Sequence, residues 1–244
     1  TLAYNTHYMA FNANMVANEM FLDSSSLRSS AVSHAKMLGY EVTSARAPKA
    51  VVNVQLTTSD ATKTMVAGTA FSTTVDGVNY QFVTISDKTS SNSGDVVTFD
   101  STEIYEGTYV IGKTIVDTSN PDQKFILTDP NADTSTLTVK VQNSTSDTTS
   151  TTYTKATDIT QLNTSSTVYY LQEAERGRFE VYFGDGVVSK ALTNGNIVIL
   201  SYVVTNKGAA NGVSTFSAPT AIDGATNIIV TTVSGAVAVS YTHL

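Results

Sequence analysis

The chain has 244 residues, of which 41% are hydrophobic and 14% are charged, and its formal net charge is −7. This length is sufficient to bury a core in one large unit or in two small domains. The absence of Cys excludes a disulfide framework and a cysteine zinc site, and an acidic chain without a run of about 20 apolar residues predicts neither nucleic-acid binding nor a membrane helix.

The first 40 residues predict two helices. Apolar side chains recur at helical spacing on two faces of the first helix, and a break follows at residues 23–26 before a second helix that ends at Gly39. A helix with two apolar faces is normally buried between several neighbours. We therefore expect a helix hairpin that stays exposed in the isolated chain and packs against partner helices. The predicted interface comprises Tyr4, Tyr8, Met9, Phe11, Met15, Val16, Met20, Leu27 and Leu38.

From residue 41 onward the sequence predicts β-structure. Residues 51–56 alternate as a strand with one apolar face, and residues 71–84 predict a hairpin that turns at Gly77. Residues 143–152 are nearly all Ser, Thr, Asp and Asn, which favours a solvated loop. The predicted fold class is α+β: an N-terminal helix hairpin, then a mainly antiparallel, sandwich-like β-body. Further strands are predicted at 95–99, 109–116, 124–127, 136–142, 168–172, 179–183 and 197–205.

The expected organisation has three parts. Residues 1–40 form the helical segment, residues 41–165 a β-domain that can contain an inserted Thr/Ser-rich subdomain, and residues 166–244 a β-region truncated at its C-terminal end. Glycines in the last part favour turns over phosphate binding, with a hairpin expected between a strand ending at Phe183 and one resuming near Val187 or later. The predicted turn residues are Gly39, Gly77, Gly184, Asp185, Gly186, Gly195, Asn196, Gly208, Asn211 and Gly212.

Residues 129–140 begin like a calcium-binding loop. Asp129, Asn131 and Asp133 have the spacing of the first ligands, but Thr134 and Lys140 occupy the positions that require Gly and Glu. An Asx-rich turn is therefore the preferred interpretation, and no metal is predicted.

Catalytic groups are sparse in this sequence. Three glutamates between residues 173 and 180 could imitate the acid pair of a glycosidase, but surface charges at strand ends are the preferred interpretation. The three histidines are too far apart to form a nucleophilic or metal site. We predict that the protein is not an enzyme and has no cofactor and no small-molecule substrate. The residues concerned are Glu173, Glu175, Glu180, His7, His34 and His243.

Two segments carry a family resemblance. Residues 179–216 contain Phe-Gly-Asp-Gly, Gly-Asn, Tyr and Asn-Gly in that order, and resemble the baseplate J-like proteins of contractile-tailed phages. The N-terminal segment resembles the start of the baseplate wedge subunits of T-even phages. Its matching residues are Leu2-Ala3-Tyr4-Asn5-Thr6, Asn12-Ala13, Leu27-Arg28-Ser29-Ser30, Gly39-Tyr40 and Thr43-Ser44.

The resemblance implies a structural protein of the virion, assembled in the host cytoplasm. It implies that the N-terminal helices join a bundle with a second copy and another wedge protein, and that copies form a ring around the tail hub. It also implies that the chain is an N-terminal portion. The competing interpretation is a surface adhesin or carbohydrate-binding β-module, which would not need the helix hairpin; a glycoside hydrolase would need two carboxylates facing each other across a cleft.

Overall fold

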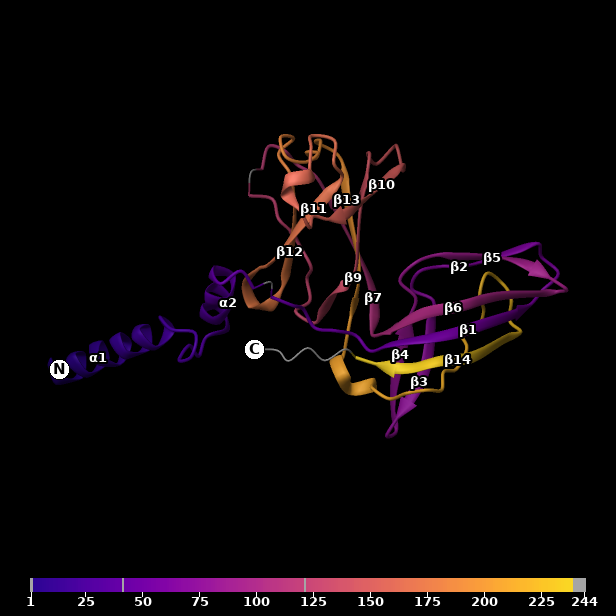
Figure 1. Ribbon diagram of the computed structural model, residues 1–244, viewed down its shortest axis with the longest axis horizontal. Coiled ribbons are helices and arrows are strands. Elements are labelled where there is room, and N and C mark those ends of the chain that lie inside the picture. The colour runs from indigo at the N-terminus through magenta and orange to yellow at the C-terminus, as the bar shows by residue number, and fades with distance from the viewer. Residues whose placement is uncertain (1, 41, 121, 239–244) are drawn as a thin grey trace.

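The computed structural model describes residues 2–40, 42–120 and 122–238, and His243 lies outside these ranges. Figure 1 shows a helical arm, residues 2–40, that projects to one side of two β-lobes. The arm contains α1 (Leu2–Glu19) and α2 (Arg28–Met37). The break between them agrees with the predicted one, but the helices do not pack side by side as the predicted hairpin would (Figure 1).

The first lobe is a seven-stranded antiparallel sheet. Its main path has the order β14-β1-β6-β4-β3, and β5 links β2 to β6. Alternate residues of β1 are buried, which confirms the predicted apolar face of 51–56. The predicted hairpin turning at Gly77 is also confirmed, with Val75 opposite Val78. The strands are β1 (Lys49–Thr57), β2 (Thr62–Met65), β3 (Ala70–Val75), β4 (Val78–Val83), β5 (Lys88–Ser93), β6 (Val96–Glu106) and β14 (Ile228–Val237).

The core of the first lobe lies between its sheet and the segment that follows the second lobe. Phe71, Phe82 and Phe99 are fully buried there. Residues 206–227, which include η3 (Lys207–Ala210), return across this lobe and contribute Ile222 to the core. Phe216 of the same segment contacts Phe82 edge-on, with ring centroids 4.9 Å apart. The lobe is thus completed by residues far apart in the sequence.

The second lobe is another seven-stranded sheet, in the order β7-β13-β9-β10-β11-β12-β8. All its pairs are antiparallel except the short parallel pair of β10 with β11. Its separate core includes Leu127, Val139, Val181 and Leu200. The elements are β7 (Thr108–Ile115), β8 (Phe125–Ile126), β9 (Ala132–Gln142), β10 (Ser150–Lys155), η1 (Ile159–Gln161), β11 (Val168–Glu173), η2 (Glu175–Gly177), β12 (Phe179–Phe183) and β13 (Ile197–Val204).

The second lobe is inserted between β6 and β14 of the first. At the entry point Gly107 has φ +126°, and a Cβ there would lie 2.1 Å from the carbonyl oxygen of Val204 at the exit. Beside it the buried Glu106 carboxylate accepts hydrogen bonds from the Thr205 hydroxyl (2.6 Å), the Asn206 backbone N–H (2.9 Å) and the Asn206 side-chain amide (2.8 Å). The two segments that connect the lobes are therefore held together by the close packing of Gly107 against Val204 and by hydrogen bonds to the buried Glu106 carboxylate.

Three expectations differ from the structure. The boundary expected between residues 165 and 166 falls inside the second lobe, so the sheets divide the chain at Gly107 instead. The segment read as a solvated loop contains the start of β10. The glycine turn after Phe183 does not form a hairpin, because β12 pairs with β11 and β8, whereas β13 pairs with β7 and β9. Local turn chemistry does not determine which strands meet.

Candidate interaction surface

The helical arm exposes every large apolar side chain that the sequence assigns to a partner interface. Neither described helix buries any of its residues. The exposed fractions of Met9, Phe11, Met15 and Met20 are 72%, 56%, 42% and 65%, against 0% for core residues such as Phe99. Monomeric proteins rarely leave a contiguous apolar surface of this kind uncovered. Tyr4, Tyr8, Val16, Leu27 and Leu38 are also exposed.

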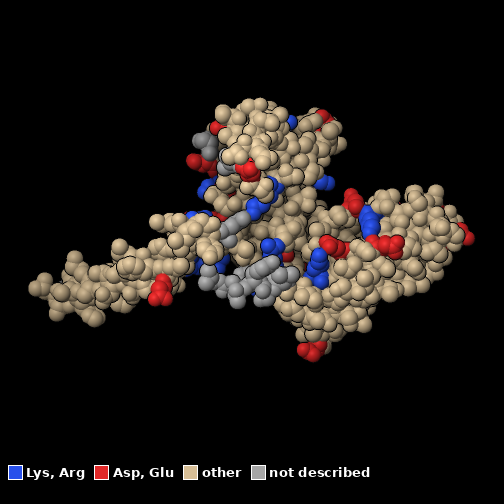
Figure 2. Space-filling model, in the orientation of Figure 1, with Lys and Arg blue, Asp and Glu red and all other residues tan. Residues whose placement is uncertain are grey.

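Charge is nearly absent from α1. In Figure 2 the outer part of the arm is almost entirely free of blue and red side chains, and Glu19 is the one Asp, Glu, Lys or Arg residue of α1. A helix of 18 residues is roughly 27 Å long. Most helical stability in proteins comes from packing of an apolar face and not from intrinsic helix propensity. The described chain provides no such packing for α1.

The joint between the helices is held by the Glu19 carboxylate and by the His34 ring, whose Nε2 lies 2.9 Å from the Glu19 carbonyl oxygen. Glu19 Oε1 accepts hydrogen bonds from the Ser26 hydroxyl (2.7 Å), the Ser26 N–H (2.9 Å) and the Leu27 N–H (3.2 Å). These groups stand at the N-terminus of α2, where backbone donors lack partners and a negative charge is favourable. Hydrogen bonds from Ser30 and Ser26 hold the pKa of the Glu19 carboxyl at about 2, below its ordinary 4.5.

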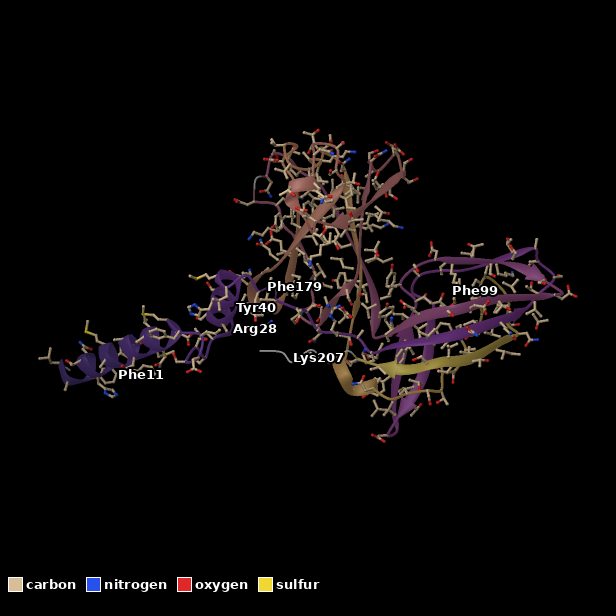
Figure 3. All side chains as sticks on the ribbon, in the orientation of Figure 1. Phe11, Arg28, Tyr40, Phe99, Phe179 and Lys207 are labelled. Atoms are coloured by element: carbon tan, nitrogen blue, oxygen red, sulfur yellow. The ribbon has the colours of Figure 1, made fainter. Side chains whose placement is uncertain are left out.

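An ion pair attaches α2 to the second lobe. Arg28 Nε and Nη2 donate to the two carboxylate oxygens of Glu173, at 2.9 and 3.3 Å, and Lys36 donates to the Glu173 backbone carbonyl at 3.3 Å. The Glu173 side chain is 4% exposed, whereas that of Arg28 is 55% exposed. Figure 3 shows Arg28 and Tyr40 beside Phe179, where the arm meets this lobe. The attachment fixes the base of the arm and leaves α1 projecting.

The two aspartates of the calcium-like loop are engaged by the chain itself. Asp129 accepts the Asn131 N–H in an Asx turn (2.7 Å), and buried Asp133 accepts the N–H groups of Ala47 (2.8 Å) and Ser135 (2.9 Å). Within the described ranges, no cluster of three His, Asp or Glu side chains is placed to hold a metal ion. None of the helices described is long and apolar enough to cross a membrane.

The predicted turn residues fall into two groups. Gly39, Gly77, Gly186, Gly195 and Gly212 have φ between +80° and +90°, the left-handed region that favours glycine. Gly184 and Gly208 do not have positive φ. A Cβ on Gly184 would instead lie 1.9 Å from the Ser189 hydroxyl, so that glycine is required by close packing within its own loop. The Asp185, Asn196 and Asn211 side chains accept backbone N–H groups of Val187, Thr193 and Ala238.

Comparisons with known proteins agree with this architecture. Residues 110–213 match the family described as the third domain of bacteriophage baseplate wedge protein gp6. That range covers most of the second lobe, and it extends the resemblance to residues 110–178, which the sequence patterns quoted above do not include. The chain is also 28% identical, over 238 residues, to baseplate wedge protein gp6 of Enterobacteria phage T4, covering 88% of this chain and 34% of that protein.

The chain is therefore similar to a baseplate wedge protein, and residues 110–213 resemble one domain of it. The chain spans about a third of the length of that curated relative.

Sequence reasoning did not find the attachment of the arm. Glu173 was considered only as a catalytic acid, and Arg28 only as part of a family pattern. The residues stand 145 positions apart, and no periodicity connects them. The exposed apolar residues of α1 were predicted, because their helical spacing on two faces can be recognised in the sequence itself.

Proposed function

We propose that this chain is a structural subunit of a phage tail baseplate wedge and acts by protein–protein assembly through its helical arm. The observation that carries the proposal is an 18-residue helix whose apolar side chains all remain exposed. The relationship to gp6 supports a structural role in the baseplate.

The partners proposed are a second copy of the chain and other baseplate wedge proteins. A helix with apolar residues around its circumference requires more than one neighbour, which favours a bundle over a single groove. Burial of this surface contributes about 25 cal/mol per Å² of apolar area before the costs of association are subtracted. With almost no charge on α1, selectivity must come from the shape of its Tyr, Phe and Met side chains.

The location proposed is the virion tail, in a ring of wedges around the hub, with assembly in the host cytoplasm. The relationship to a baseplate protein supports this location. The adhesin or carbohydrate-binding alternative accounts for the β-rich lobes but gives no role to the arm, so it is the weaker proposal.

The test is co-expression of the chain with the other wedge proteins of its phage, followed by isolation of the complex. Phe11→Asp and Met15→Asp place a charge in the predicted bundle and should abolish co-purification. Asn14→Asp adds the same charge to the same helix at an exposed polar position and is the matched control. The thermal transition of the β-lobes should be unchanged in all three variants, because α1 does not contribute to either core.

Two results would contradict the proposal. One is normal assembly of the Phe11→Asp and Met15→Asp variants. The other is turnover of a glycan or peptide substrate by the wild-type chain.

A further inference from the structure

The edge of the first sheet formed by β14 differs from the other described sheet edges. Exposed edge strands are usually protected by charges, bulges, short length or a covering segment, because their unpaired backbone groups recruit other strands. The β7 edge carries Lys113, the four-residue β2 edge carries Lys63, and β8 is only two residues long. The β3 edge is covered by Ser217, whose N–H donates to the Ser72 carbonyl at 2.7 Å. β14 is ten residues long and contains no charged residue.

The direction of the backbone groups shows which part of this edge is open. The Thr57 N–H donates to the carbonyl of Asn227 (3.1 Å), so Asn227 faces β1, and Ile229 and Thr231 lie opposite Gln55 and Asn53 in register with it. Because backbone groups alternate along a strand, those of residues 228, 230 and 232 face away from β1. Among the described residues, none pairs with β14 on that side at these positions.

Farther along, the same edge is closed. The Ala236 N–H donates to the Val213 carbonyl (2.6 Å), and the Gly212 N–H donates to the Ala236 carbonyl (2.7 Å). The open stretch therefore runs over residues 228–234, and the segment at 212–213 limits how far another strand can extend along it.

The side chains of this stretch are arranged symmetrically about Thr231. Ile229 and Val233, two positions before and after it, are each 56% exposed, and Thr231 between them is exposed too. Val230 packs against the core on the opposite face. An antiparallel copy of this strand would place Ile229 opposite Val233 and Thr231 opposite itself. Pairs of β-branched side chains and Thr–Thr pairs are favourable across strands, and no like charges would meet.

We propose that β14 pairs with β14 of a second copy of this chain, antiparallel and two-fold symmetric about Thr231. In this register the outward backbone groups of Val230 and Thr232 face those of Thr232 and Val230 in the second copy, which is the arrangement of a hydrogen-bonded antiparallel pair. The two first lobes become one continuous sheet. The contact is isologous, as two-fold interfaces between identical chains are. It uses a surface remote from α1, so it does not depend on the proposed function of the arm.

Single cysteines test the pairing directly, because the chain has no native Cys. Thr231 would sit in a non-hydrogen-bonded pair with itself, at a Cα separation of about 4.5 Å. That distance lies within the range that disulfides span. Thr231→Cys should therefore form a covalent dimer on mild oxidation of the 244-residue chain, roughly tenfold faster than Ile229→Cys, whose self-pair would lie far outside that range.

A mixed experiment tests the register. Ile229→Cys and Val233→Cys should cross-link to each other when mixed, and each should cross-link poorly alone. Thr231→Lys, which opposes two like charges, should lower the dimer fraction seen by analytical ultracentrifugation when it is made in the Phe11→Asp background, in which association through the arm is removed. Equal cross-linking of all single variants, no cross-linking at Thr231, or an unchanged dimer fraction in Thr231→Lys would each overturn the proposal. None of these outcomes bears on assembly through the arm.

Discussion

The helical arm exposes the same kinds of apolar side chain that the β-lobes bury. Phe99 in the first lobe is 0% exposed, and Phe11 on α1 is 56% exposed, although both stand in regular apolar patterns. Each lobe encloses a core within the chain itself, and a third, smaller cluster includes Val83 of the first lobe and Val203 of the second. The arm has an apolar pattern without a core, so we propose that other chains cover its apolar surface. An apolar pattern thus indicates burial, but it does not show whether the same chain or another chain provides the covering surface.

The largest effect on the free energy of unfolding should come from truncating the buried Phe99 side chain. Phe99→Ala should lower the free energy of unfolding of the first lobe by about 3–5 kcal/mol, because it removes a fully buried side chain and leaves a cavity. Phe11→Ala, the matched change on the arm, should stay within about 0.5 kcal/mol in the isolated chain. Urea denaturation followed by near-ultraviolet circular dichroism measures both. Similar losses in the two variants would mean that the arm is part of the folded core.

The junction between the lobes should be the next most sensitive position. Gly107→Ala should cost about 3 kcal/mol or more, because it adds backbone strain at φ +126° and a Cβ that collides with the Val204 carbonyl. Gly77→Ala is the control: φ is +81° but nothing lies within 4 Å, so the cost should be about 1 kcal/mol. Equal melting temperatures for the two variants would contradict the close approach of Gly107 to the Val204 carbonyl.

The smallest effect concerns the joint within the arm. The pKa of Glu19 is lowered from 4.5 to about 2, so the folded arm favours the carboxylate. Its stabilisation of α2 should be fully present above pH 4.5 and should disappear as the pH falls to about 2. NMR titration of the α2 amides should show this transition in the wild type and not in Glu19→Gln. The same transition in Glu19→Gln would assign it to another group.

Much of the fold was predictable because strong local patterns coincide with the strands. Residues 51–56 alternate strictly, and the Asp76–Gly77 turn joins two β-rich runs, so both were found. β2 and β5 were missed because Ser, Thr, Asn and Lys dominate them and carry no alternation. β14 was missed as a full strand because its apolar start is followed by Thr, Ser and Gly. The pairing of β12 could not be foreseen, since it depends on contacts far apart in the sequence.

The candidate site was predictable only in part, for a similar reason. The exposed residues of α1 follow from helical spacing, which is a local property. The ion pair of Arg28 with Glu173 and the open edge of β14 require knowledge of which elements become neighbours. Exposure of a strand edge, in particular, is a property of the whole sheet and not of the strand's own residues.

The insertion of one lobe into the other imposes an order on folding. The first sheet needs β14, which follows the entire second lobe in the chain, so β1 has an unpaired edge until residues 228–237 arrive. Non-local pairing of this kind slows folding, because a long loop must close before its contacts form. Synthesis from the N-terminus also leaves that edge exposed for the time taken to translate about 120 further residues. During this interval the second lobe, whose strands are contiguous in sequence, can fold first. Its folding brings together Gly107, where the chain enters that lobe, and Val204, where it leaves.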